Sequence, residues 1–359
     1  FEYDVDSAYF ARYVHQLIEA GAVLVGGCCG TTPTQIAAAV EAANEHRRGL
    51  TREATTSPDV AEVKVVALHG PQPTQRPFAD VMSSLVVALT PPPPDGIEQS
   101  VELARQLGDA GVDLCWVVPG RGNKAQVNSV DLALHLRQRL GIETMATVTT
   151  WDRTIMALQA DLLGAHALGV RRIVCETGSP PLMGDYPNVD GVWDVDSIGL
   201  IELLAGLNEG IDYYGLHLAS KTEFEIGARV NPGTRNPDLE AARVRDKISA
   251  GAQFLITRPI YELVGLERLL AAIDGRVGVL VTVQPLTGFA EAEYLLNEVP
   301  DVTIPASTLE ALERAGRDGA QAGIELAAEL AFAVRDFAKG IVIPQMPGIL
   351  SLVSRLEAN

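Results

Sequence analysis

Two adjacent cysteines carry the clearest chemical signal in this sequence. Cys28 and Cys29 stand within the octet Gly26–Pro33, directly after a short apolar run, Val23–Val25, that predicts a strand. Neighbouring side chains of a regular strand point to opposite faces, but glycines at a strand end let both thiols turn toward one centre. Two thiolates held in this way suit a soft, tetrahedral metal such as zinc. The alternative is a pair of small buried cysteines, because paired metal ligands more often stand two to four residues apart.

From residue 83 onward, short apolar runs rich in Val, Ile and Leu alternate with longer helical patterns. The predicted strands are Leu85–Leu89, Leu114–Val118, Met145–Thr149, Arg172–Cys175, Phe224–Ala228, Phe254–Thr257, Val277–Val283 and Ile341–Ile343. The predicted helices are Gln99–Ala110, Ser129–Leu140, Ile155–Leu168, Asp196–Leu207, Leu239–Ala250, Leu263–Ala272 and Leu309–Lys339, the last with a break. Eight strand–helix units in succession predict a (β/α)8 TIM barrel, whose strands are buried on both faces.

An open doubly wound sheet is the alternative fold. It is less favoured because eight units are many for such a sheet and because no glycine-rich fingerprint follows the first strand. A barrel places its working groups at the carboxyl ends of its strands. These ends are at residues 88–92, 117–122, 147–153, 177–181, 229–232, 258–261, 284–287 and 344–347.

The composition limits the classes of protein that need to be considered. The chain has 359 residues and a net charge of −18, which argues against binding to nucleic acid or to an anionic membrane. No uncharged apolar run approaches the roughly 18 residues that span a bilayer, and no signal peptide is expected. Four cysteines without a spaced framework predict a reducing, cytoplasmic setting. Residues 35–48 predict one helix, and the Thr-, Ser-, Pro- and Gln-rich stretch that follows predicts a linker.

The cysteine octet and its flanks, from Asp4 to Ile36, resemble the C-terminal end of the homocysteine S-methyltransferases. The resemblance implies that Cys28 and Cys29 are two of three cysteine ligands of a zinc ion, with the third upstream of Phe1. The open position of that zinc would take homocysteine as a reactive thiolate. The chain therefore predicts only the last strand and helix of a methyltransferase barrel.

Residues 83–348 resemble methylenetetrahydrofolate reductase, in the form fused behind a homocysteine methyltransferase. The best matching stretches are 158–166, 184–187, 194–197, 247–252 with 257–259, 297–300 and 303–305. The resemblance implies FAD in the barrel mouth and reduction of 5,10-methylenetetrahydrofolate to 5-methyltetrahydrofolate by NADH or NADPH, feeding methionine synthesis. The expected domains are a methyltransferase remnant at 1–49, a linker at 50–80 and a reductase-like (β/α)8 barrel at 81–359; a homo-oligomer is a further expectation.

The sequence departs from the reductase pattern at the ends of the strands. Ala88 stands where the family has its general acid, a Glu, and Ser179 stands where it has an Asp that faces flavin and folate. Thr147 replaces a His that contacts FAD, and Arg258 replaces a Gln. Lys247, near the flavin phosphates in the family, is kept. The resemblance assigns cofactor contacts to Thr147, Thr177, Gly178, Ser179 and Lys247, substrate contacts to Arg258 and Tyr261, and metal binding to Cys28 and Cys29.

Three interpretations follow from these replacements. In the first, the barrel still reduces methylenetetrahydrofolate, and Glu176 or Asp152 supplies the proton. In the second, it is a non-catalytic module that binds a folate or another one-carbon carrier for the methyltransferase. In the third, it is an enzyme of different specificity in which Arg258, always cationic, grips a carboxylate or phosphate. The structural alternative for Arg258 is an ion pair with Glu262.

Overall fold

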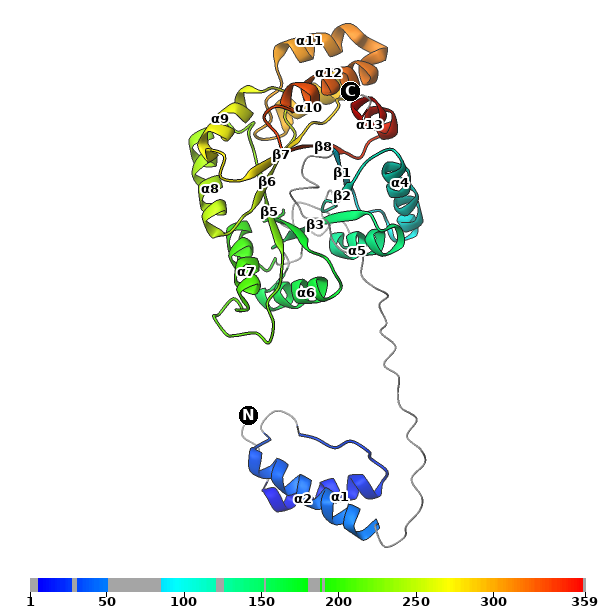
Figure 1. Ribbon diagram of the computed structural model, residues 1–359, viewed down its shortest axis with the longest axis vertical. Coiled ribbons are helices and arrows are strands. Elements are labelled where there is room, and N and C mark those ends of the chain that lie inside the picture. Colours follow the sequence, from blue (N-terminus) through cyan, green and yellow to red (C-terminus); the bar gives the residue numbers. More distant parts are fainter. Residues whose placement is uncertain are drawn as a thin grey trace. The chain divides into compact units, whose positions relative to one another are not determined.

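A computed structural model describes residues 6–27, 31–50, 85–120, 126–151, 153–179, 188 and 191–357. The chain divides into two compact units, residues 1–70 and 71–359 (Figure 1). Cys28 and Cys29 lie outside the described residues, as does the predicted linker from residue 51 onward.

The first unit is a pair of helices, α1 (Ser7–Glu19) and α2 (Pro33–Leu50), which pack against each other. The strand predicted at Val23–Val25 is wrong. The run is irregular, and Val23 and Leu24 are almost fully exposed. The physical reason is that a parallel strand needs a neighbour for its N–H and C=O groups, and the described residues of this unit contain no other strand.

The second unit is a closed barrel of eight parallel strands, as predicted. Each strand pairs with the next along the chain, and β8 pairs with β1. The strands are β1 (Leu85–Leu89), β2 (Leu114–Val117), β3 (Glu143–Thr149), β4 (Arg172–Glu176), β5 (Glu225–Val230), β6 (Phe254–Thr257), β7 (Gly278–Thr282) and β8 (Gly340–Pro344). All eight predicted strands are therefore present, with ends that shift by two residues at most.

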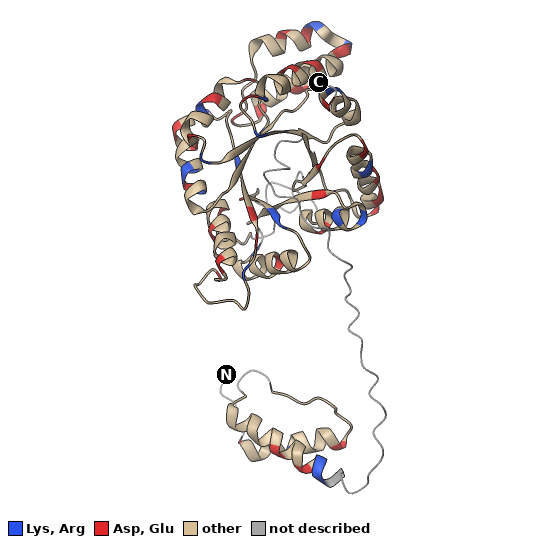
Figure 2. Ribbon diagram, viewed as in Figure 1, with Lys and Arg blue, Asp and Glu red and all other residues tan. Residues whose placement is uncertain are grey.

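Helices surround the barrel (Figure 1). They are α4 (Ile97–Asp109), α5 (Ser129–Leu140), α6 (Ile155–Ala167), α7 (Ser197–Glu209), α8 (Pro237–Ala250), α9 (Val264–Ile273), α10 (Phe289–Glu298), α11 (Ala306–Ala315), α12 (Gly319–Val334) and α13 (Ile349–Glu357). The break predicted within 309–339 falls between α11 and α12, whereas α10 and α13 were not predicted. None of the described helices combines the length and apolar character needed to cross a bilayer. Lys, Arg, Asp and Glu lie mainly on these outer helices (Figure 2).

Alternate strand residues fill the interior of the barrel. The interior cluster consists of Val86, Ala88, Leu114, Trp116, Met145, Val174, Phe254, Ile256, Leu280 and Val342. Gly227 on β5 makes room for the Phe254 ring, because a Cβ at this position would lie 2.3 Å from it. At the amino ends of the strands, Arg172 on β4 is fully buried and forms ion pairs with Glu143 on β3 and Glu225 on β5. The interior is thus packed, and the opposite, carboxyl end is left to form a site.

Candidate functional site

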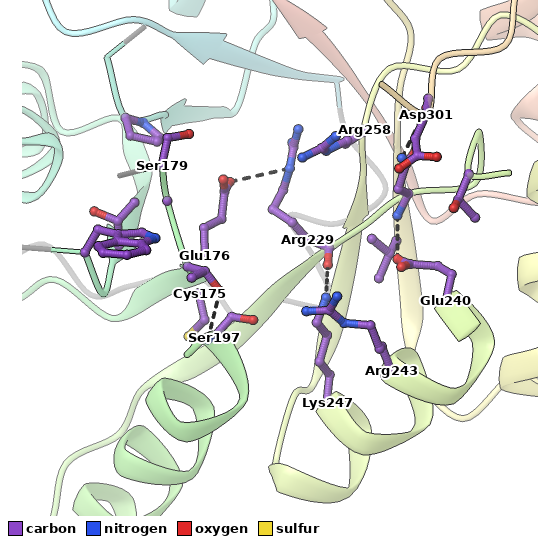
Figure 3. Close-up of a pocket in the computed structure, with 18 of the residues that line it drawn as sticks. Cys175, Glu176, Ser179, Ser197, Arg229, Glu240, Arg243, Lys247, Arg258 and Asp301 are labelled. Carbon is purple, nitrogen blue, oxygen red and sulfur yellow. Dashed lines mark hydrogen bonds and ion pairs between the residues drawn. The ribbon is translucent and has the colours of Figure 1, made fainter. Parts of the chain in front are cut away.

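A pocket of about 510 Å³ opens at the carboxyl ends of β3 to β6, where a barrel is expected to carry its site. Figure 3 shows its cationic and acidic side chains converging from β4, β5, β6 and α8. The lining residues that come from predicted strand ends are Pro119, Gly120, Thr149, Trp151, Thr177, Gly178, Ser179, Arg229, Val230, Asn231 and Arg258. The observed pocket therefore lies at strand ends that were predicted from the sequence, although no role was predicted for Arg229.

The floor below this pocket is built around Trp116. Its indole Nε1 donates a hydrogen bond to Thr147 Oγ1 at 2.9 Å, and both side chains are buried. The guanidinium of Arg229 lies 4.8 Å from the centroid of the Trp116 ring, within cation–π range. Ala88, at the expected acid position, stands in register with Trp116 and is also buried. An indole and a guanidinium therefore occupy the part of the mouth where the resemblance implies a carboxylic acid.

Glu176 at the end of β4 is the acidic partner of Arg229. Its Oε1 lies 3.4 Å from Arg229 Nε, and Figure 3 shows the two side chains meeting between β4 and β5. Burial lowers the pKa of Arg229, Glu176 opposes that shift, and the nearby charge of Arg258 adds to it. Arg229 and Arg258 are thus like charges close together in one pocket, and the Glu176 carboxylate pairs with Arg229.

Lys247 on α8 is anchored to the strand beside it. Its Nζ donates to the carbonyl oxygen of Arg229 at 2.6 Å (Figure 3), and burial lowers its pKa. Thr177 is held in a similar way, because its Oγ1 accepts the N–H of Ser197 at 3.2 Å. These contacts fix α8 to β5 and α7 to the end of β4. Lys247 therefore has a positioning role, and the cofactor contact that the resemblance implies stays a prediction.

Two arginines of the pocket have no acidic partner among the residues that the structure describes. The three acidic lining side chains are each engaged: Glu176 with Arg229, Glu240 with the N–H of Asn231, and Asp301 with the N–H of Arg235. Arg243 and Arg258 form no ion pair with any residue that the structure describes, and the pair considered for Arg258 and Glu262 is not formed. In a chain of net charge −18, the pocket thus has four cationic lining side chains against three acidic ones.

The structure brings together Thr177, Gly178, Ser179, Lys247 and Arg258, but it separates two other predicted residues from them. Thr147 is buried below the pocket, where its hydroxyl accepts a hydrogen bond from the Trp116 indole. Tyr261 packs against the cluster of Leu286, Ala292, Ile304 and Leu312. Asp152, Cys28 and Cys29 lie outside the described residues, and within the described part of the chain no three potential metal ligands gather. Arg243 was missed because it lies on a helix, away from the strand ends.

Comparison with known proteins supports both resemblances. A family model described as methylenetetrahydrofolate reductase matches residues 87–345, more than half of the chain, and one described as homocysteine S-methyltransferase matches residues 1–43. A relative, methylenetetrahydrofolate reductase (NADH) 1 of Arabidopsis thaliana, is 24% identical over 176 residues, which are 47% of this chain and 28% of that protein. The chain thus spans less than a third of the length of this relative.

The chain is also similar in fold to solved structures. An uncharacterized protein from Clostridium thermocellum, which binds two copies of 5-methyl-5,6,7,8-tetrahydrofolic acid, superposes with a TM-score of 0.55 at 12% identity. The superposition covers 77% of this chain and 95% of that one. At this level of identity, the likeness supports the barrel fold.

Proposed function

Since the chain belongs to the methylenetetrahydrofolate reductase family, we propose that its barrel reduces 5,10-methylenetetrahydrofolate to 5-methyltetrahydrofolate with FAD and NADH or NADPH. The observation that carries this proposal is the pocket at the carboxyl ends of β3 to β6, in which Arg243 and Arg258 lack acidic partners among the described residues. A folate carries carboxylates and FAD carries a pyrophosphate, so both present anions that such a pocket favours. The folate bound by the Clostridium thermocellum protein is the product of the proposed reaction.

The residues of the pocket fit a dinucleotide. Arg243 and Arg258 offer guanidinium groups that match phosphate geometry. Gly178 has a φ of +84°, and a Cβ there would lie 3.0 Å from Thr149 Cβ, so the glycine lets the backbone after β4 come close to β3. FAD, when bound, would carry the hydride from the nicotinamide to the folate. Ser179, Thr177 and Gly178 would line its polar edge.

Glu176 is our candidate for the proton donor. Opening the five-membered ring of the folate requires a general acid, which Ala88 cannot provide and Ser179 can provide only as a weak donor. Glu176 is a carboxyl group at the end of β4 that lines the pocket, held by Arg229 at 3.4 Å. In the balanced reaction Glu176 takes up a proton from solvent and passes it to the folate nitrogen, the methylene carbon gains the hydride, and NADH or NADPH is oxidised.

The match at residues 1–43 extends the proposal to methionine synthesis, in which homocysteine would accept the methyl group made by the barrel. Zinc enters only for a methyltransferase part that adds a third thiolate to those of Cys28 and Cys29.

A turnover assay tests the proposal. The full chain, supplied with FAD, methylenetetrahydrofolate and either nicotinamide, is expected to form 5-methyltetrahydrofolate, followed by mass spectrometry. Glu176→Gln should lower kcat by about 10²-fold or more, as loss of a general acid does. The exposed Glu209→Gln on α7 is the matched control and should leave turnover unchanged. Folate binding without any product would instead identify a non-catalytic folate-binding module.

A further inference from the structure

Two tryptophans stack at the edge of the mouth pocket. The rings of Trp151 and Trp193 have centroids 5.3 Å apart and planes inclined by 19°. Trp151 lines the pocket, and Trp193 is 57% exposed. Large apolar rings are normally withdrawn from water, so an exposed stack beside a cavity calls for an explanation.

The backbone holds both rings in place. The N–H of Trp151 donates to the carbonyl of Thr177 at 3.1 Å, which ties the residue to the end of β4. Trp193 pairs with Arg153 in a parallel bridge, and the next residue, Asp194, accepts the N–H of Ile155 at 2.8 Å. The pair is therefore preorganised, which reduces the entropy lost when a ligand binds.

The pocket combines a stacked pair of indole rings at its edge with cationic side chains in its lining. Indole faces stack well on heteroaromatic rings, whatever hydrogen bonds those rings make at their edges. The same pocket contains Arg243 and Arg258, which have no acidic partner among the described residues. A ligand with a flat ring at one end and an anionic group at the other would satisfy both features.

The geometry points to the Trp151–Trp193 pair as a stacking platform for the heteroaromatic ring of an anionic ligand, whose phosphate or carboxylate reaches Arg243 and Arg258. This inference rests on the proposed function for its two candidate sources. One source is the adenine ring of a dinucleotide, and the other is the ring system of a folate.

Tryptophan fluorescence measures this contact directly. The chain has three tryptophans, and the third, Trp116, is buried in the barrel floor. The full chain, without FAD or reductant, is titrated with ADP and separately with 5-methyltetrahydrofolate, with correction for ligand absorbance. Equilibrium dialysis measures the affinity in parallel. We expect one of the two probes to quench the fluorescence, and the probe that does so identifies the source of the ring.

Three variants distinguish a loss of ring stacking from a general loss of structure. Trp193→Ser should weaken binding of the quenching probe by about tenfold, whereas Trp193→Phe, which keeps an aromatic face, should stay within about threefold of the native chain. Tyr214→Ser removes an aromatic side chain that is 75% exposed and does not line the pocket, so it is the matched control and should change nothing. Circular dichroism confirms the fold of each variant.

Two results would overturn the platform. The first is that neither probe quenches the fluorescence, and the second is that Trp193→Ser binds both probes as tightly as the native chain. Because these titrations contain no flavin, a chain that stacks a ring but does not reduce folate would reject the proposed reaction alone. A chain that reduces folate at unchanged rate and affinity in Trp193→Ser would reject the platform alone.

Discussion

Ala88 on β1 and Trp116 on β2 stand in register in the barrel interior, so a methyl group lies beside an indole at the point where the family has its acid. The missing carboxylate is therefore accompanied by a bulky neighbour, and the effects of substituting Ala88 and Trp116 are expected to depend on each other. Inserting Glu at position 88 alone would crowd Trp116.

We predict that Ala88→Glu lowers the free energy of unfolding by about 1–3 kcal/mol through overpacking. Trp116→Leu should relieve part of this cost, giving a favourable coupling of about 0.5–3 kcal/mol in a double-mutant cycle. Urea unfolding of the native chain, both single variants and the double variant measures the coupling. Strict additivity of the two changes would show that the residues are independent.

Two glycine-to-alanine substitutions test the packing of the barrel, one expected to lower the free energy of unfolding and one expected to raise it. Gly227→Ala should lower the free energy of unfolding by about 1–3 kcal/mol, because its Cβ would lie 2.3 Å from the buried Phe254 ring. Gly164→Ala, in the exposed interior of α6 with nothing within 4 Å of the new Cβ, should raise it by roughly 0.5–1 kcal/mol. Thermal unfolding followed by circular dichroism compares them. Equal effects of the same sign would contradict the packing described for β5 and β6.

The buried thiols of the barrel are expected to be unreactive. Burial raises the pKa of Cys115 to about 12 and also raises the pKa of Cys175, so at pH 8 almost no thiolate is present in the folded state. Iodoacetamide at pH 8 should leave both residues unmodified until urea unfolds the chain, as peptide mass spectrometry can follow. Rapid modification of Cys175 in the native protein would mean that the end of β4 opens.

Arg172 is expected to be essential for stability at the amino end of the barrel. Arg172→Leu removes a buried cation from between Glu143 and Glu225, and the two carboxylates that remain should cost about 3–5 kcal/mol. The same substitution at the exposed Arg105, which pairs with Glu102 on α4, should cost less than about 1 kcal/mol. Urea midpoints measure both. A small effect at Arg172 would show that the ion pairs are dispensable.

Much of the fold followed from the sequence because buried parallel strands are continuous apolar runs. Leu85–Leu89 and Phe254–Thr257 were predicted with their observed bounds. The segment 289–298 was not predicted as a helix, since only Ala292 is fully buried and its other apolar residues, Phe289, Leu295 and Leu296, are only partly buried. Val23–Val25 has the composition of a strand, but a strand forms only where a neighbour offers hydrogen bonds.

The site was harder to predict because its residues meet only after the barrel closes. In the sequence, Arg229 is one cation in an apolar run, and its contacts with Trp116 and Glu176 join three strands. The stack of Trp151 and Trp193 joins residues on either side of α6. Lys247 was singled out through the resemblance, and only the structure shows its bond to the backbone of β5.

The visible spectrum of the purified full chain, with and without added FAD, tests the central claim most directly. The proposed reductase should bind FAD, show the absorption of an oxidised flavin, lose it when NADH or NADPH is added without air, and regain it when methylenetetrahydrofolate follows. A colourless chain that takes up no FAD would contradict flavin-dependent reduction at the mouth of this barrel.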